Sequence, residues 1–563
     1  MNTPVPAETL ALQRFYKWER EAARDRPALV QPMGGGALRE FTWAQLADET
    51  RRMAAYLQGL GLEPGARVAI LSKNCAWWLM SDLAIWMAGY VSVPLYPTLA
   101  ADTVRQILVH SEARACFVGK LDGWEAMRPG VPAGLPCITY ALSPKTDYPC
   151  WDDIVARTAP LAGHPVRDAD ELCSLMYTSG TTGNPKGVMH SFGTFAWSIT
   201  QALLRIDIGE RDRMFSYLPL AHVAERMIVE HGWLAANPQV HFAESLDTFA
   251  ADLQRARPTI FFSVPRLWVK FQQGVHAKMP PHKLKLLLGL PIVGGLVRKK
   301  VLGALGLDAC RYAAGGAAPM PAELLAWYAR LGLQISEVYG MTENCGVSHA
   351  TLPGEPRPGT VGFTYDGVES RIDAASGEIQ VRSPGTMLGY YKEPELTRQT
   401  FTDDGWLKTG DKGALDADGA LRITGRVKDL FKTSKGKYVA PAPIEDRLVM
   451  HPAVEACVVT GANLGQPLGI VMLAPDAAKK SKQGGAERQA IEAALEAHLG
   501  AVNATLDPHE QLAFVVAVTT PWTVDNGFVT PTMKVKRNRI EEVYGASYEG
   551  WVGQRRRVLW DAA

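Results

Sequence analysis

The sequence predicts an α/β protein with a large N-terminal domain, whose βα-type sheets are covered by helices, and a small, mobile α+β C-terminal domain. The chain has 563 residues, too many for one hydrophobic core. In residues 1–425, strand-like apolar runs alternate with helical periodicity, which is typical of parallel sheets. This pattern changes after residues 426–429, interpreted as a hinge, so residues 430–563 are expected to form the second domain.

Periodicity and capping predict the first elements. Residues 9–60 have helical spacing of apolar side chains, and Thr42 is a candidate N-cap for the helix that begins T-W-A-Q-L. The run Leu83–Ala101 has about the length of a membrane span. Because Gly89 and two prolines interrupt it, a helix followed by a buried strand is expected instead. Further strands are expected at 67–72, 115–119 and 136–140.

Composition indicates an ordinary globular protein with 47% apolar and 21% charged residues. A net charge of +1 gives no argument for a nucleic-acid partner. The eight cysteines form no C-x-x-C pair and no Cys/His cluster, so neither a zinc site nor a disulfide framework is indicated. No secretory signal is visible at the start, so a cytoplasmic protein is expected. The oligomeric state stays open.

The chain is organised around the segment M-Y-T-S-G-T-T-G-N-P-K-G, Met176–Gly187. Seven of the ten residues from Thr178 to Gly187 are Gly, Ser or Thr, and Lys186 adds a positive charge. Backbone N–H groups and hydroxyls in such a loop can surround a phosphate. The apolar residues before it predict a strand and residues 194–206 a helix, so we expect a phosphate-binding strand-to-helix turn. The alternative is a flexible linker.

Two later segments carry candidate site residues. In S-Y-L-P-L-A-H-V-A-E-R, His222 lies among apolar residues, where a histidine is more often a core residue than a catalyst. In I-S-E-V-Y-G-M-T-E-N, Tyr339 could stack on a base, Thr342 could bind a phosphate and Glu343 could hold Mg²⁺. The alternative for this second segment is a buried strand followed by a polar turn.

Glycines and charged side chains complete the candidate set. Gly315 and Gly316 in R-Y-A-A-G-G-A-A-P let a backbone approach a flat ligand. Asp411 in G-W-L-K-T-G-D could accept hydrogen bonds from two ribose hydroxyls, or it could be a turn aspartate. Beyond the hinge, strands are expected at 454–460, 469–475 and 512–518, a helix at 486–499 and a mobile polar loop at 476–485.

These motifs, in this order, resemble the adenylate-forming superfamily of acyl-CoA synthetases, luciferases and peptide-synthetase adenylation domains. The H-x-x-E-R segment and S-V-P-R-L-W at 263–268 are similar to the long-chain fatty acyl-CoA synthetase branch. The resemblance covers residues 10–544. It implies catalytic roles for Lys534, His222, Thr342 and Glu343, a hinge at Lys428, and Mg²⁺ contacts by Thr178 and Glu343. It implies nucleotide binding by Thr178, Ser179, Gly180, Thr181, Thr182, Gly183, Lys186, Gly315, Gly316, Ala317, Tyr339, Gly340, Met341, Asp411 and Arg426.

The implied reaction is long-chain fatty acid activation with ATP, Mg²⁺ and CoA. A carboxylate attacks the α-phosphate of ATP to give acyl-AMP and pyrophosphate, and the CoA thiol then displaces AMP. Met533 replaces the glycine that usually precedes the family's catalytic lysine, here Lys534, as in long-chain members. Two alternatives stay open: an acyl-AMP ligase that transfers to a carrier protein's phosphopantetheine, and a non-catalytic nucleotide- or lipid-binding relative. The sequence leaves the acyl chain length open.

Residues 278–300 are apolar in the centre and basic at both ends. The apolar centre, Leu286–Val297, is about 12 residues long, whereas a bilayer span takes about 20. The favoured interpretation is two short core helices with solvated basic ends. The alternative is a peripheral contact with an anionic membrane, which would place the protein at the inner membrane surface.

Overall fold

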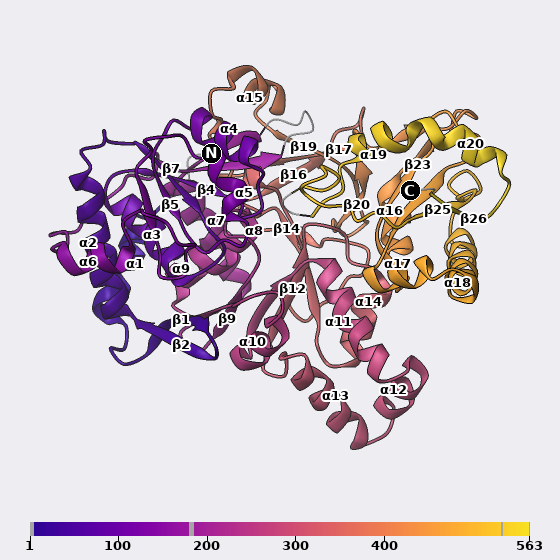
Figure 1. Cartoon of the computed structure of the whole chain (residues 1–563), viewed down its shortest axis with the longest axis horizontal. Helices are drawn as coiled ribbons and strands as arrows, with labels where there is room; N and C mark the ends of the chain where they lie inside the picture. The colour runs from indigo at the N-terminus through magenta and orange to yellow at the C-terminus, as the bar shows by residue number, and fades with distance from the viewer. Residues whose placement is uncertain (1–4, 180–184, 531–532, 562–563) are drawn as a thin grey trace.

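The computed structural model describes residues 5–179, 185–530 and 533–561. Its mixed α/β architecture, with a large N-terminal part and a smaller C-terminal part, confirms the predicted fold class (Figure 1). Two large sheets and their helices make up the N-terminal part, and the C-terminal part forms a separate body around its own sheet.

The first large sheet carries the glycine-rich hairpin at one edge. Within the described residues it has seven strands in the order β18-β8-β7-β4-β3-β5-β6. The strands from β7 to β6 run parallel, whereas β8 and β18 are antiparallel to their neighbours. The strands are β3 (Arg67–Leu71), β4 (Val91–Leu95), β5 (Ala113–Val118), β6 (Cys137–Thr139), β7 (Leu172–Ser179), β8 (Pro185–Ser191) and β18 (Gly389–Tyr390).

The second large sheet is parallel at its centre and antiparallel at both ends. In the described part of the chain its nine strands follow the order β15-β14-β13-β12-β11-β9-β10-β1-β2. They are β1 (Pro27–Gly34), β2 (Ala37–Thr42), β9 (Arg213–Ser216), β10 (Gln239–Phe242), β11 (Ile260–Ser263), β12 (Tyr312–Gly316), β13 (Ile335–Tyr339), β14 (His349–Ala350) and β15 (Phe363–Thr364).

Helices cover both sheets, and their cores are rich in tryptophan. The α3 residues Trp77, Trp78 and Trp86 are fully buried, and Trp43 of α2 stacks on Trp233 with 4.7 Å between ring centroids. The larger helices are α1 (Ala11–Glu21), α2 (Trp43–Gly59), α3 (Ala76–Met87), α4 (Ala101–His110), α6 (Trp151–Arg157), α7 (Phe192–Arg205), α10 (Phe249–Ala256), α11 (Pro265–Lys278), α14 (Ala322–Arg330) and α15 (Pro394–Thr400). The shorter ones are η1 (Ala7–Thr9), α5 (Trp124–Met127), η2 (Arg128–Gly130), α8 (Val223–Glu225), η3 (Arg226–His231), α9 (Gly232–Ala236) and η4 (Thr342–Asn344).

Several sequence-based expectations are confirmed here. Thr42 caps α2 in a capping box with Gln45. The long apolar run Leu83–Ala101 contains the end of α3 and the buried strand β4, as its glycine and prolines predict. Within residues 9–60 the helices are confirmed, but β1 and β2 separate them.

A smaller sheet leads into the C-terminal part. It comprises β16 (Glu369–Ile372), β17 (Glu378–Arg382), β19 (Leu407–Leu415) and β20 (Leu421–Arg426). A turn at 427–429 follows, where the N–H of Val427 donates to the carbonyl of Gly410. The short pair β21 (Phe431–Lys432) and β22 (Tyr438–Val439) comes next. The predicted hinge therefore coincides with a turn between two differently built sheets.

The C-terminal sheet agrees with the sequence pattern except at one helix. Residues 476–485 were expected to form a loop, but most of them lie in α17, which Pro475 begins. That expectation was wrong because a lysine-rich exposed helix has the same composition as a loop, and only the glycines at 484 and 485 break it. The elements are α16 (Pro441–Leu448), β23 (Val454–Thr460), β24 (Leu468–Leu473), α17 (Pro475–Lys482), α18 (Gly485–Asn503), β25 (Val515–Val518), α19 (Arg537–Tyr544), η5 (Gly545–Ser547), α20 (Tyr548–Gly553) and β26 (Val558–Trp560).

Residues 278–300 form a helical hairpin that projects from the body (Figure 1). Its helices are α12 (Pro281–Leu288) and α13 (Val293–Ala304). The two short helices are as expected, but only part of the apolar surface is core: Leu284 and Val301 are buried, whereas Leu286, Ile292 and Leu296 are 67%, 86% and 67% exposed. None of the helices in the described ranges has the length and apolar character needed to cross a bilayer.

Candidate active site

The glycine-rich segment is the connection of a β-hairpin. Thr178 of β7 pairs with Lys186 of β8 in an antiparallel register. The predicted strand-to-helix turn is therefore wrong: β8 intervenes, and α7 begins only at Phe192. The short strand was missed because Pro185 and Gly187 hide its alternation. A helix dipole at this loop is consequently not part of the site. The predicted nucleotide-binding residues Gly180, Thr181, Thr182 and Gly183 lie outside the described residues.

Tyr390 connects this hairpin to Glu343. The hydroxyl of Tyr390 donates a 2.7 Å hydrogen bond to Oε1 of Glu343, and the ammonium nitrogen of Lys186 lies 5.8 Å from the centre of the Tyr390 ring. Tyr390 belongs to β18, which pairs with β8. Both Tyr390 and Glu343 are buried. Sequence reasoning missed Tyr390, since nothing in G-Y-Y-K-E-P indicates a contact with a distant carboxylate.

His190 provides a second connection. Its Nε2 lies 2.7 Å from the carbonyl oxygen of Thr342, so this nitrogen must carry the proton. Burial lowers the pKa of His190 to about 4, which keeps the ring neutral. The other nitrogen, Nδ1, faces Thr194 and the Cys345 thiol. The second strand of the glycine-rich hairpin thus fixes the backbone of the Thr342-Glu343 turn.

The backbone on the other side of the site is held close by glycines. A β-carbon at Gly316 would lie 2.8 Å from the carbonyl oxygen of Val338, and one at Gly340 would lie 2.3 Å from the carbonyl carbon of Gly346. Gly315 and Gly316 end β12, and Ala317 follows with a positive φ of 67°. Met341 then caps η4, where its N–H donates to Oδ1 of Asn344 over 2.9 Å. These close approaches bring the ends of β12 and β13 together.

Tyr339, Asp411 and Arg426 meet as one cluster. The Tyr339 hydroxyl donates to Oδ2 of Asp411 over 2.8 Å, and Nε of Arg426 donates to Oδ1 over 2.9 Å. Asp411 and Arg426 face each other across the β19–β20 pair. The structure therefore brings together three residues that span 87 positions of the sequence, from 339 to 426.

His222 lies at the start of α8, where its Nδ1 accepts a 3.2 Å hydrogen bond from the Ala224 N–H. Burial and the positive charge of Lys534 lower the pKa of His222 to about 4. Glu225, three residues later, accepts hydrogen bonds from Asn74, Ser216 and Tyr217, and burial raises its pKa to about 8. His222 is thus half-buried, neutral and close to Lys534, whereas Glu225 supports the local fold.

The adjacent Arg226 is fully buried and contacts Asp82 of α3. Its Nε also lies 3.3 Å from Glu230. Burial raises the pKa of Glu230 well above its usual range, which favours the neutral acid there. The H-x-x-E-R segment is therefore anchored to α3 through the buried ion pair of Arg226 with Asp82.

Lys534 comes from the C-terminal part and enters this site. The carboxylates of Asp411 and Glu343 favour its charged form, but removal from water and then the Arg426 guanidinium lower its pKa. The side chain itself remains exposed to solvent. Met533 has a φ of 62°, the left-handed region that favours glycine. Met533 thus holds a backbone conformation that glycine adopts more easily.

Two sets of ion pairs fix the C-terminal part around the site. Nε of Arg537 lies 3.1 Å from Asp429 in the turn, and Nη2 lies 2.5 Å from Glu445 of α16. Glu455 of β23 contacts Arg266 of α11 in the N-terminal part. The predicted hinge residue Lys428 is exposed and immediately precedes Asp429 in the turn.

Glu343 is the candidate ligand for a magnesium ion. No group of three His, Cys, Asp or Glu side chains that could hold a metal occurs in the described residues. Magnesium is usually bound through one or two carboxylates and substrate phosphates. Glu343 fits this role, because the hydrogen bonds among the described residues use only its Oε1. The site thus combines the carboxylates of Glu343 and Asp411, the ammonium group of Lys534 and the glycine-rich hairpin.

Sequence profiles agree with this geometry. The profile described as AMP-binding enzyme matches residues 16–391, and that of the AMP-binding enzyme C-terminal domain matches residues 428–550. The chain belongs to the AMP-binding enzyme family. For this AMP-binding enzyme, the resemblance seen in the sequence is therefore confirmed, and so is the prediction that the chain is an enzyme.

Similar proteins cover nearly the whole AMP-binding enzyme. The long-chain-fatty-acid–CoA ligase FadD15 of Mycobacterium bovis is 32% identical over 94% of this chain and 95% of its own length. The peroxisomal long chain acyl-CoA synthetase 6 of Arabidopsis thaliana is 29% identical over 90% of this chain and 81% of its own.

Solved structures share the fold. The anthranilate CoA ligase AuaEII in complex with anthranoyl-AMP has a TM-score of 0.77 at 24% identity and covers 96% of this chain and 98% of its own. The A-PCP didomain of carboxylic acid reductase from Segniliparus rugosus, in complex with AMP, has a TM-score of 0.81 at 23% identity and covers 97% and 83%. At these identities the likeness concerns the fold alone.

Proposed function

We propose that this AMP-binding enzyme is a long-chain fatty acid–CoA ligase that forms AMP. The observation that carries the proposal is the position of Lys534, which belongs to the C-terminal part and lies close enough to Arg426, Asp411 and Glu343 for their charges to act on its ammonium group. The names of similar ligases, FadD15 and long chain acyl-CoA synthetase 6, support the substrate class.

In the first half-reaction, a carboxylate oxygen attacks the α-phosphorus of ATP, and the bond to pyrophosphate breaks. Charge builds on the phosphate oxygens, so positioned cations lower the barrier. Lys534 would neutralise the α-phosphate and the carboxylate, and Lys186 would hold the outer phosphates. Asp411 would accept hydrogen bonds from the ribose hydroxyls, and Tyr339 would stack on the adenine. A bound Mg²⁺ would neutralise phosphate oxygens, held by Glu343 with the Thr178 hydroxyl.

In the second half-reaction, the CoA sulfur attacks the acyl carbonyl carbon, its proton is lost, and AMP leaves. Neutral His222 lies close to Lys534 and fits a position beside the carboxylate. We place the domain boundary as the sequence predicts, with residues 1–425 before a hinge at 426–429 and residues 430–563 after it. Rotation at Lys428 would withdraw Lys534 and turn another face of the small domain toward the thiol.

A pyrophosphate-release assay with a fatty acid series, with and without CoA, tests this function. Fatty-acid-dependent pyrophosphate release and thioester formation with CoA are the expected results. Adenylation with transfer only to a phosphopantetheinyl carrier protein would instead identify an acyl-AMP ligase. Absence of pyrophosphate release with every acid would identify a non-catalytic relative.

We also propose that the protein contacts a membrane peripherally through the α12–α13 hairpin. Its exposed residues Leu286, Ile292 and Leu296 are apolar, and basic residues flank them at 283, 285 and 298–300. Apolar side chains would enter the interface of an anionic bilayer, and each basic residue would add about 1 kcal/mol. Long-chain fatty acids partition into bilayers, so this contact would bring the enzyme to its substrate.

Vesicle co-sedimentation at low and high salt tests the contact. Binding to anionic vesicles should weaken at high salt. It should also weaken in a variant with Arg298→Gln, Lys299→Gln and Lys300→Gln. The control replaces three lysines of α17 (Lys479→Gln, Lys480→Gln and Lys482→Gln), which removes the same charge elsewhere. Equal binding by the two variants, or none at low salt, would refute the contact.

A further inference from the structure

A second pocket lies at the opposite edge of the seven-stranded sheet from the phosphate hairpin. It has a volume of about 650 Å³, within the range of small-molecule sites. Its floor includes the edge strand β6, and five inter-strand steps separate β6 from β8. At about 4.8 Å per step these strands lie roughly 24 Å apart. None of the residues assigned above to the active site lines it.

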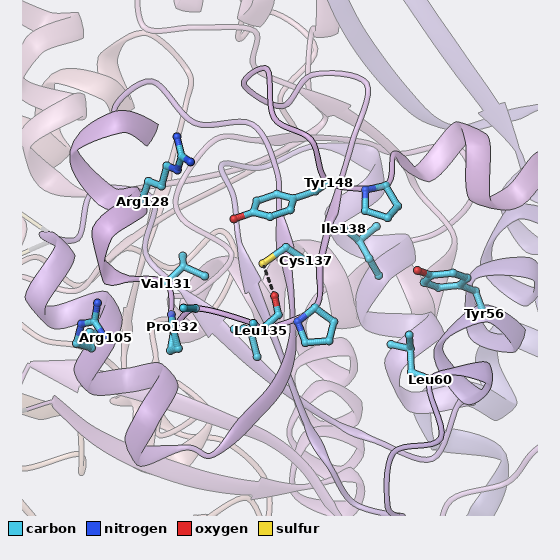
Figure 2. A pocket seen from close by; sticks show the side chains of 14 residues that line it. Tyr56, Leu60, Arg105, Arg128, Val131, Pro132, Leu135, Cys137, Ile138 and Tyr148 are labelled. Carbon is cyan, nitrogen blue, oxygen red and sulfur yellow. Dashed lines mark hydrogen bonds between the residues drawn. The ribbon is translucent and has the colours of Figure 1, made fainter.

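One end of the pocket is basic. Arg105 of α4 and Arg128 of η2 lie on the same side of it in Figure 2. Arg105 donates to the carbonyl of Pro129, and in the described part of the chain neither guanidinium has a carboxylate within ion-pair distance. Arginine pairs strongly with carboxylate and phosphate groups. Two unneutralised guanidinium groups at a pocket therefore favour an anion.

The rest of the pocket is mainly apolar. Val131, Leu135 and Ile138 line its middle, and Leu60 lies at the end away from the arginines, beside Tyr56 (Figure 2). Pro132 and Pro136 restrict the connecting segment, whose backbone is also held by bonds from Leu135 to Pro132 and from Cys116 to Pro136. A preformed apolar surface that continues from a basic end fits a ligand with an anionic head and an alkyl chain.

We propose that this pocket binds a single-chain amphipathic anion, with the head at Arg105 and Arg128 and the alkyl chain along Val131 and Leu135 toward Leu60. The head group is a carboxylate, as in a fatty acid, or a phosphate, as in an alkyl phosphate. Either source uses the same two guanidinium groups. None of the residues proposed above to take part in the adenylation reaction lines this pocket.

Calorimetric titration tests the proposal with the active site filled by a non-hydrolysable acyl-sulfamoyl adenosine. Sodium dodecanoate and dodecyl phosphate are titrated below their critical micelle concentrations. At least one of them should bind, with one further equivalent per protein chain. Binding of only one identifies the head group. The double variant Arg105→Gln, Arg128→Gln should lose at least about tenfold in affinity, since it removes two charge-assisted contacts. Arg157→Gln, on α6 outside the pocket, should bind like the wild type.

Amide exchange gives an independent readout, because the ligand should slow exchange in residues 131–138 of the wild type but not of the double variant. No further equivalent, equal affinity in the double variant, or equally tight binding of uncharged dodecanol would overturn the proposal. Failure of the adenosine analogue to bind would count against the proposed function instead. The comparison of variants would then be run on the unliganded protein.

Discussion

The hydroxyl of Tyr390 donates a 2.7 Å hydrogen bond to the carboxylate of Glu343, which lies 47 residues earlier in the chain. Tyr390 stands on the strand beside the phosphate hairpin, with its ring near Lys186. The carboxylate proposed to hold Mg²⁺ is thus oriented by the same edge of the sheet that carries Lys186, the lysine proposed to bind phosphates. This hydrogen bond depends on the tertiary structure and is not indicated by any local motif.

Tyr390→Phe should weaken the use of magnesium–ATP, because Glu343 loses a hydrogen bond to a charged group. Such a bond contributes about 1.5–3 kcal/mol, equivalent to roughly 10- to 100-fold in kcat/KM for ATP. Pyrophosphate release and the direct binding of ATP with and without Mg²⁺ are the measurements. The control is Tyr391→Phe, whose hydroxyl contacts Glu112 at the surface. A similar loss in both variants would refute the positioning role.

Lys534→Ala should abolish acyl-AMP formation while CoA attack on supplied acyl-AMP continues. The lysine neutralises charge in the first transition state only, and loss of one such donor costs about 100- to 1000-fold. The two half-reactions are measured separately. Lys536→Ala, which removes an exposed charge two residues away, serves as the control. Equal loss of both half-reactions in Lys534→Ala would contradict this role.

Lys428→Pro should preserve adenylation and slow thioester formation, because proline fixes φ in the turn and blocks rotation there. Lys428→Ala removes the same charge but leaves φ free, so both half-reactions should stay near the wild-type rate. Single-turnover measurements of each half-reaction separate the effects. Unchanged thioester formation in the proline variant would remove Lys428 as the pivot.

Glu225→Gln should make stability less dependent on pH. Burial raises the pKa of Glu225 from 4.5 to about 8, so the folded protein holds a proton that the unfolded chain releases. This contribution to stability is complete below pH 4.5 and is lost as the pH rises to about 8, at up to about 1.4 kcal/mol per unit. Urea unfolding at pH 6, 7 and 8 should therefore show a steeper decline for the wild type than for Glu225→Gln. Parallel declines would show that Glu225 is ionised in the folded protein.

The sequence predicted most elements whose pattern is local. The α2 cap at Thr42, the helix and strand within Leu83–Ala101, and β23 over Val454–Thr460 were all recognised, since capping and periodicity depend on neighbouring residues. Glycine and proline concealed β8, and a lysine-rich composition concealed α17. β8 forms because it pairs with β7 in a hairpin, and α17 forms beside α18, the next helix in the chain.

In the candidate site, too, the residues within local motifs were predicted, whereas contacts between distant segments were not. Motifs located Tyr339, Asp411 and Arg426, and the structure joins them through hydrogen bonds. Tyr390 and His190 were missed because their partners lie 47 and 152 residues away. A buried polar side chain needs a partner, but the sequence does not say which one.

Arg537 has a consequence for the direction of the proposed reaction. It binds Asp429, one residue beyond Lys428, and Glu445, and it lies three residues after Lys534. These ion pairs connect the segment that carries Lys534 to the turn of the proposed hinge and to α16. Rotation about this turn would move the ammonium group of Lys534 away from the nucleotide. Pyrophosphate would then lack the cation that it needs to attack acyl-AMP. In the proposed mechanism, the rotation that admits the thiol would therefore also prevent the return to ATP.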